Sequence, residues 1–246
     1  MKTDINLVKE NIYNLTSLWE TAGAPFLCNH KTEWFQYCNI ENSDWPNKLW
    51  FSEDITENSV VKALEVFKTK KNLVIPYWDI YQNNSSEILE KHNFKIKSEQ
   101  TAMFLKLEKT FDELYKLNYK RVLNEKDAEI WTSIYPTAFR YRIGKEILLQ
   151  QFSNLQFHLV YLEEKPIGTF MLFQTQNNIG IHGLGIIPEM RKRGYAEEIM
   201  KFILNYAIDS KIDYALLQAS AMGKDIYTRL GFEDLFVIKN YTLSDS

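Results

Sequence analysis

The sequence is poor in cysteine and has no long hydrophobic run. Cys28 and Cys38 are its only cysteines, too few for a disulfide framework and typical of a protein of the reducing cytoplasm. Their spacing fits neither a CxxC redox pair nor a four-ligand zinc site, so we expect no metal. No apolar stretch approaches the roughly 18 residues of a membrane span. The opening MKTDINLVKE has acids where a secretory signal has its apolar core. We therefore expect a cytoplasmic protein without a membrane partner.

An excess of positive charge is also absent. The 246 residues carry 29 Lys and Arg against 32 Asp and Glu, and the net charge is −3. This balance gives no electrostatic reason to expect nucleic acid as a partner. With 45% hydrophobic and 25% charged residues, the composition is that of an ordinary soluble globular protein, either a monomer or a homodimer. The length allows one large domain or two modest ones.

Glycine is nearly missing from the first half of the chain. Gly23 is the only glycine before Gly144, and the other eight lie between Gly144 and Gly231. Tryptophan has the opposite distribution, because five of the six lie in the first third. Glycines allow close backbone approach, so we expect the residues that bind a ligand through the backbone to lie in the second half. The charged stretch 107–117 is the best candidate for a connection, either as a linker or as a short helix, between a domain at 1–110 and a domain at 117–246.

The second half alternates between the periodicities of strands and helices. The expected order is an antiparallel meander followed by a parallel β-α-β crossover, in an α+β fold with a mixed, mostly antiparallel central sheet flanked by helices. Predicted strands are Tyr119–Leu123, Phe157–Leu162, Ile167–Gln174, Ile179–Ile187, Tyr214–Ala219 and Leu235–Leu243. Predicted helices are Lys126–Ala138, Lys145–Phe152, a long helix from Ala196 to Ala207, and Asp225–Leu230.

The sharpest local signal is the hexapeptide RKRGYA at 191–196, placed between a strand and the long helix. A helix N-terminus offers unpaired N–H groups and partial positive charge, which suit a phosphate. Gly194 and Ala196 let the backbone close around a pyrophosphate, and Arg191, Lys192 and Arg193 add charge-assisted contacts. Taken alone, the hexapeptide is equally consistent with a solvated basic turn.

The strand before this loop, 179–187, contains three glycines. Glycines weaken a strand and mark a bulge or a close backbone neighbour. A bulged strand that diverges from the next one opens a groove, where its free backbone groups can pair with an amide-bearing ligand such as pantetheine. The chain has no G-x-x-x-x-G-K, and its glycine spacing is not the dinucleotide fingerprint.

Residues 179–232 resemble the GNAT (Gcn5-related N-acetyltransferase) superfamily. Arg191–Ala196 matches its Q/R-x-x-G-x-G/A acyl-CoA signature, and the string LQASAMGKDIYTRLGF at 217–232 resembles its later strand–helix motif, which ends in Y-x-x-x-G-F. The resemblance implies a GNAT fold for 117–246 and acetyl-CoA as co-substrate. It implies acyl transfer, with acetyl as the default, to a primary amine of a small molecule or a protein.

The same resemblance implies a binding site for the co-substrate. The expected contacts are the pyrophosphate with the backbone around Arg193–Ala196, and pantetheine with the strand Leu184–Ile187 and with Ser220. The expected binding residues are Leu184, Gly185, Ile186, Ile187, Arg191, Lys192, Arg193, Gly194, Tyr195, Ala196 and Ser220. Two alternatives stay open: a non-catalytic regulatory module that senses acyl-CoA, and an unrelated α+β binding protein.

Two residues are candidates for catalysis. Tyr227 stands where the family commonly has the acid that protonates the leaving CoA thiolate; the alternative is a core residue on a short amphipathic helix. His182 lies in the glycine-rich strand, close to where relatives have a glutamate base, and could relay a proton through water. The alternative for His182 is a structural histidine bonded to a neighbour. Ser220 could orient a water or pantetheine, or simply begin a turn.

The first half contains a sequence pattern that is similar to that of the second half but less complete. Glu87–Phe94 aligns with Asp225–Phe232, with Leu89 in place of Tyr227 and Asn93 in place of Gly231. Predicted elements are Lys48–Phe51, Val60–Lys68, Leu73–Trp78 and Ala102–Leu107, which repeat a strand–helix–strand–helix–strand order. We interpret the first half as a smaller α/β domain, a degenerate, non-catalytic GNAT-like copy, with chance similarity as the alternative. Its tryptophans favour core packing over an aromatic cage for the acceptor.

Overall fold

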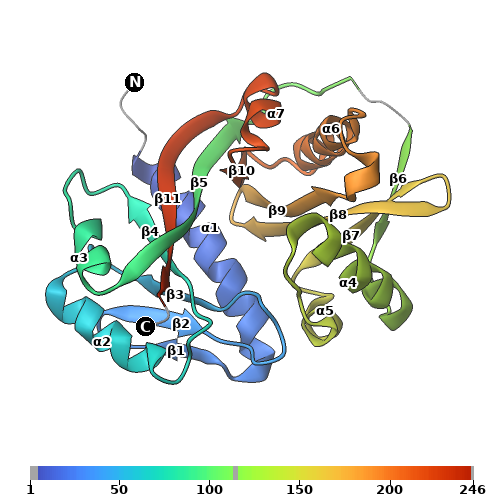
Figure 1. The fold of residues 1–246 in the computed structure, drawn as a ribbon. Helices are drawn as coiled ribbons and strands as arrows, with labels where there is room; N and C mark the ends of the chain where they lie inside the picture. The colour runs from blue at the N-terminus through green and yellow to red at the C-terminus, as the bar shows by residue number, and fades with distance from the viewer. Residues whose placement is uncertain (1–4, 113–115, 245–246) are drawn as a thin grey trace.

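Most of the chain packs around one eight-stranded sheet (Figure 1). The computed structural model describes residues 5–112 and 116–244. Strand order in the large sheet is β4-β11-β5-β10-β9-β8-β7-β6, and a small sheet has the order β1-β2-β3. Within the large sheet, β9 and β10 pair in parallel, and every other neighbouring pair is antiparallel. The prediction of a mixed, mostly antiparallel sheet flanked by helices is confirmed.

The second half contains the predicted elements, each within a few residues of its expected bounds. They are β6 (Leu117–Arg121), α4 (Glu125–Phe139), α5 (Lys145–Gln151), β7 (Gln156–Leu162), β8 (Lys165–Thr175), β9 (Asn178–Ile186), α6 (Tyr195–Asp209), β10 (Tyr214–Ser220), α7 (Lys224–Arg229) and β11 (Glu233–Leu243). A short 3-10 turn, η2 (Pro188–Met190), lies between β9 and α6. The described parts of the connection, 107–112 and 116–117, are not helical; residues 113–115 lie outside the described residues.

The first half contains the predicted elements and three that sequence analysis missed. The predicted set is β3 (Lys48–Phe51), α2 (Glu57–Phe67), β4 (Ile75–Asp79), α3 (Ser86–Lys91) and β5 (Phe94–Lys106). The missed elements are the long helix α1 (Ile5–Gly23) and the strands β1 (Asn29–Lys31) and β2 (Phe35–Cys38); a 3-10 turn, η1 (Ala24–Phe26), follows α1. The first half therefore contains strands as well as helices and is not an all-helical extension of the second half.

The large sheet crosses the expected domain boundary near residue 110. Strand β5 lies between β10 and β11, and β11 in turn pairs with β4. In Figure 1, β5 (green) and β11 (red) run side by side through the middle of the molecule. The element orders β3-α2-β4-α3-β5 and β9-α6-β10-α7-β11 are the same, and the helix–turn ends alike: Asn93 has φ 64° and Gly231 has φ 95°. The degenerate repeat remains an interpretation. If the two halves are copies, the last strand of the first copy, β5, pairs with β10 of the second, and the last strand of the second, β11, pairs with β4 of the first.

Helices cover both faces of the large sheet. On one face, α1, α4 and α5 pack in a cluster that includes Trp131, Tyr135 and Phe157. On the other face, α6 supplies Ile199, Ile203 and other apolar residues to a second cluster. A third cluster lies under α2 and α3, between the small sheet and β4, β5 and β11. Strand β9, which lies between β8 and β10, is thus covered on both faces. Any site in β9 therefore lies at the centre of the fold.

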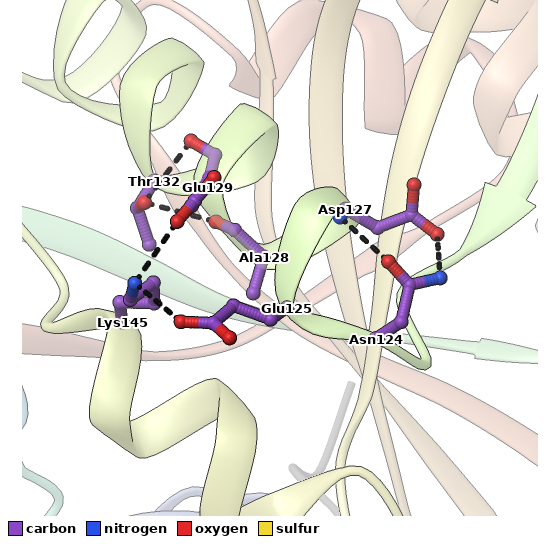
Figure 2. A network of polar contacts seen from close by, with 7 residues as sticks. All are labelled: Asn124, Glu125, Asp127, Ala128, Glu129, Thr132 and Lys145. Carbon is purple, nitrogen blue, oxygen red and sulfur yellow. Dashed lines mark hydrogen bonds and ion pairs between the residues drawn. The ribbon is translucent and has the colours of Figure 1, made fainter.

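The helix α4 is held firmly at its N-terminus (Figure 2). Asn124 caps the helix, because its Oδ1 accepts from the Asp127 N–H at 3.0 Å while its Nδ2 donates to the Asp127 carboxylate at 2.8 Å. Lys145 Nζ bonds both Glu125 (2.9 Å) and Glu129 (3.1 Å), and so ties α5 to α4. These contacts fix the direction of α4, whose far end reaches the glycine-rich strand β9.

Candidate active site

The strands β9 and β10 diverge halfway along their length. They pair only from Asn178–Ile181 to Tyr214–Leu217. Beyond that point β9 keeps its bonds to β8, with an irregularity between Thr169 and Met171, while its other edge has no strand partner. Gly183 has φ +55°, the left-handed region that glycine tolerates best. The glycine-rich strand therefore has the expected irregularity, and among the described residues no strand pairs with this edge of residues 182–186.

Two further glycines of β9 provide space for neighbouring side chains. A Cβ on Gly180 would lie 1.9 Å from Asn14 Oδ1 and 2.4 Å from His182 Nε2. A Cβ on Gly185 would lie 2.5 Å from the Phe139 ring of α4. Real Cβ atoms do not approach so closely. These positions are therefore restricted to glycine by packing rather than by backbone angles.

The hexapeptide at 191–196 forms an open corner at the start of α6. Gly194 has φ +84°, and nothing lies within 4 Å of where its Cβ would be. The N–H groups of Glu197 and Glu198 both donate to the Gly194 carbonyl, so the N–H groups of Tyr195 and Ala196 precede the helical bonding pattern. The result is an uncovered helix N-terminus with adjacent cationic residues, which is suited to an anion.

The basic side chains of this corner have different positions. Arg191 donates through Nε to the Ile186 carbonyl (2.9 Å) and through Nη2 to the Ala138 carbonyl (3.2 Å). It therefore holds the loop against β9 and α4. Arg193 donates to the Glu189 carbonyl at 3.3 Å, and Lys192 is exposed with φ +60°.

A cavity of about 900 Å³ continues from the gap between β9 and β10. Its walls include Ile181 and Leu217 from one face of the sheet and His182 and Gln218 from the other, so the cavity passes through the gap. Residues of the first half, with Trp19 among them, share the rest of the wall with further residues of the second half, such as Tyr141 and Tyr227. A cavity of this size is typical of a small-molecule site, and here it is built jointly by the two halves.

Tyr227 lines this cavity from α7. The side chain is half-buried, and its ring meets Phe232 edge-on with centroids 5.9 Å apart. Ser220, at the end of β10, lies close by: a Cβ on Gly223 would be 3.7 Å from both the Ser220 Oγ and the Tyr227 hydroxyl. Burial raises the pKa of Tyr227 to about 12. The phenol therefore keeps its proton at neutral pH.

His182 lines the same cavity and is held by α1. Its Nε2 lies 3.1 Å from Asn14 Oδ1. Asn14 Nδ2 donates to the Phe173 carbonyl and to Thr175 Oγ1, so Oδ1 is the acceptor, and the ring proton is on Nε2. Nδ1 is then the basic nitrogen. Burial lowers the pKa of His182 to about 4, against a smaller opposing effect of a hydrogen bond with Gln218.

A polar network under the cavity was missed by sequence analysis. Gln218 Nε2 donates to Asn11 Oδ1 at 2.9 Å, and Asn11 Nδ2 donates to the Met103 carbonyl at 3.1 Å. Asn240 Nδ2 donates to Gln100 Oε1 at 3.1 Å. The signal was present in the sequence: Asn11 and Asn14 interrupt the apolar stripe of α1 and are fully buried. Buried amides in an apolar stripe indicate a bonded partner.

Two other histidines and the tryptophan Trp19 have contacts with neighbouring side chains. His158 stacks on Phe170 with centroids 4.5 Å apart, and His92 Nε2 lies 2.5 Å from Glu57. Trp19 packs against Trp50 and Trp78, with centroids 5.5 and 6.3 Å away. Over residues 5–112 and 116–244, no group of His, Cys, Asp and Glu is placed to hold a metal ion. No helix in that part of the chain has the length and hydropathy needed to cross a membrane.

The mixed sheet, the diverging parallel strands and the helix that begins beside Gly194 together make up the GNAT fold. Residues 121–232 match the model of the acetyltransferase (GNAT) family. The second half of the chain therefore contains a GNAT-family domain. Among curated proteins, none matches this sequence.

Solved structures share the fold over nearly the whole chain. A GCN5-related N-acetyltransferase from Kribbella flavida has a TM-score of 0.70 at 13% identity, covering 96% of this chain and 97% of its own. A functionally unknown conserved protein from Staphylococcus epidermidis has a TM-score of 0.61 at 14% identity, covering 88% and 93%. A GCN5-related N-acetyltransferase from Sphaerobacter thermophilus has a TM-score of 0.61 at 12% identity, covering 84% and 75%. The similarity thus extends to the first half.

Proposed function

We propose that the protein is an acyl-CoA-dependent N-acyltransferase that moves an acetyl group from acetyl-CoA to a primary amine of a small molecule or a protein. The observation that carries the proposal is the order of three features along β9 and the loop after it. Residues 182–184 line the cavity that contains Tyr227, the strand edge at 182–186 is not paired with β10, and the open corner at Gly194 follows at the start of α6. The GNAT-family match covers every one of these residues.

Each part of the groove fits a part of the co-substrate. The N–H groups at the start of α6 suit the pyrophosphate, with Lys192 and Arg193 as nearby cations. The free edge of β9 offers backbone groups for the amides of pantetheine, and Ser220 lies at the end of the facing strand. Arg191 is proposed to hold the loop in place, because its side chain donates to the carbonyls of Ile186 and Ala138.

Tyr227 is proposed as the acid that protonates the departing thiolate. A phenol with a pKa of about 12 is protonated when the reaction starts, and negative charge on sulfur develops only as the thioester breaks. The amine reacts as its free base, about one molecule in a few thousand at pH 7. His182, which is neutral at that pH, is proposed to take the nitrogen's proton through Nδ1, directly or through water, once attack makes the nitrogen acidic.

Amine-dependent thiol release from acetyl-CoA tests the proposal. Purified protein incubated with acetyl-CoA and a panel of amines should release CoA thiol at a rate that depends on one class of amine. Binding of CoA without turnover on any amine, small or peptidic, would identify a regulatory acyl-CoA module instead. If the protein neither binds CoA nor releases thiol from acetyl-CoA, the proposal that this groove binds the co-substrate is wrong.

A further inference from the structure

Three lysines of the first half, Lys48, Lys71 and Lys97, line the cavity that also contains Tyr227, and two of them carry the inference. Lys48 begins β3, and its side chain points to the same side of the strand as Trp50. Its Nζ lies 5.8 Å from the centroid of the Trp19 ring, one of the cavity walls. The amine of Lys48 thus faces the interior of the cavity, over an aromatic ring.

Lys97 lines the cavity from β5. It lies in the irregularity of the β5–β11 pair, where Ser98 faces Asn240 and Ile96 faces Tyr241, so that Lys97 has no opposing residue. Burial and the positive charge of Lys97 together lower the pKa of Lys48 to about 8. The two amines are therefore close enough to repel one another.

The acids at the cavity wall do not neutralise these amines. Asp44 Oδ2 accepts from the Arg142 N–H at 2.7 Å. Glu99 stands directly opposite Lys239 on the neighbouring strand β11. Within residues 5–112 and 116–244, neither Lys48 nor Lys97 forms an ion pair. Lys97 is exposed, whereas Lys48 is partly buried. A partly buried cation that faces a second cation and has no counter-ion is unfavourable, and an anionic ligand would relieve this.

We propose that Lys48 and Lys97 bind a carboxylate of the acceptor, so that the acceptor is an amino acid or another small amine with a carboxylate. This inference rests on the proposed function. The carboxylate would lie at the end of the cavity formed by the first half, and the amine would point toward the gap where Tyr227 and His182 lie. The first half then selects the substrate, and the second half carries out the transfer.

The test compares matched acceptors in the thiol-release assay. Each amino acid of a panel is measured beside its amide and beside the amine that lacks its carboxyl group. Wild-type protein should prefer the carboxylate form at least tenfold in kcat/KM. Lys48→Met should lower kcat/KM for amino acids by about 10- to 100-fold, the range of one charge-assisted contact, and leave the amides unchanged. Lys48→Arg should retain most of the preference.

Two further variants separate the proposal from a folding defect. Lys97→Met changes an exposed side chain and should also weaken the preference for carboxylates, whereas Lys95→Met, on the same strand but outside the cavity, should not. Equal activity on amino acids, amides and plain amines would overturn the proposal. So would a loss in Lys48→Met that is the same for all three acceptors.

The carboxylate has a second conceivable source, the acyl chain of a dicarboxylic acyl-CoA. If Lys48→Met impairs transfer from succinyl-CoA and leaves transfer from acetyl-CoA to amino acids intact, the assignment to the acceptor is overturned. If no amine supports turnover, the proposed function fails, and calorimetry with N-acetyl amino acids and their amides tests the lysines separately. Binding of the acid forms alone, lost in Lys48→Met, supports the carboxylate site; equal binding or none contradicts it.

Discussion

His182 Nε2 lies 3.1 Å from Asn14 Oδ1, joining residues 168 positions apart in the chain. The contact links α1, at the start of the chain, to the glycine-rich strand at the centre of the sheet. It orients the imidazole and sets which nitrogen carries the proton. It also depends on Gly180, because any larger residue there would occupy the position of the Asn14 side chain.

Gly180→Ala should destabilise the protein by about 1–3 kcal/mol, the usual effect of extra volume in a packed core. The new Cβ would overlap Asn14 Oδ1 and His182 Nε2, so the contact must break or β9 must shift. Urea unfolding measures the change. Gly144→Ala is the matched control, because its Cβ would meet only ordinary or slightly tight contacts from 3.3 Å outward. Wild-type stability in Gly180→Ala would mean that α1 does not pack on β9 as described.

The burial of neutral His182 should make stability depend on pH. The pKa of its imidazole is about 4 in the folded protein and 6.5 ordinarily, so between these values the unfolded chain binds a proton that the folded one does not. The corresponding stability is fully present above pH 6.5 and is lost as pH falls toward 4. At pH 5 the loss is about 2 kcal/mol for this residue.

Urea unfolding of wild type and His182→Gln, at pH 7.5 and pH 5, measures that loss. The variant should lose about 2 kcal/mol less than wild type between the two pH values, whatever its stability at pH 7.5. His158, whose pKa burial also lowers to about 4, is present in both proteins and does not enter the difference. Equal losses in the two proteins would show that His182 is not buried in its neutral form.

Gly194→Trp should abolish or strongly weaken CoA binding while the protein stays folded. An indole would cover the open corner at the start of α6, and a side chain is strained at φ +84°. Calorimetry with CoA measures the affinity, which we expect to be micromolar for wild type. Lys211→Trp is the control, since it adds the same ring at an exposed left-handed position beyond the other end of α6. Unchanged affinity in Gly194→Trp would place CoA elsewhere.

The sequence predicted the elements of the second half because each has a local pattern. The helix around Tyr227 and the glycine-rich strand are recognisable from periodicity and composition alone. The helix α1 was missed because Asn11 and Asn14 interrupt its apolar stripe, and their partners lie far along the chain. Strand β5 was predicted only from Ala102, because its exposed residues 95–99 are stabilised by pairing with β11 rather than by an apolar pattern of their own.

The cavity could not be predicted for a related reason. Its walls come from strands and loops of both halves, and β5 lies between β10 and β11 only in the folded chain. The residues expected at the catalytic side, Tyr227, His182 and Ser220, do line this cavity. The cavity residues of the first half, such as Lys48 and Trp19, belong to a part of the chain whose composition suggested only core.

Turnover and CoA affinity of Tyr227→Phe, measured side by side, test the central claim most directly. The substitution removes one hydroxyl and keeps the ring against Phe232. If the phenol protonates the departing thiolate, amine-dependent thiol release should fall about 100- to 10,000-fold where that step limits the rate. The Kd for CoA should change little, because the charge that the hydroxyl meets exists only in the transition state. Tyr206→Phe, an exposed tyrosine of α6, should be unaffected in both measurements. Full activity of Tyr227→Phe on a good acceptor would contradict the account and make the phenol a packing residue.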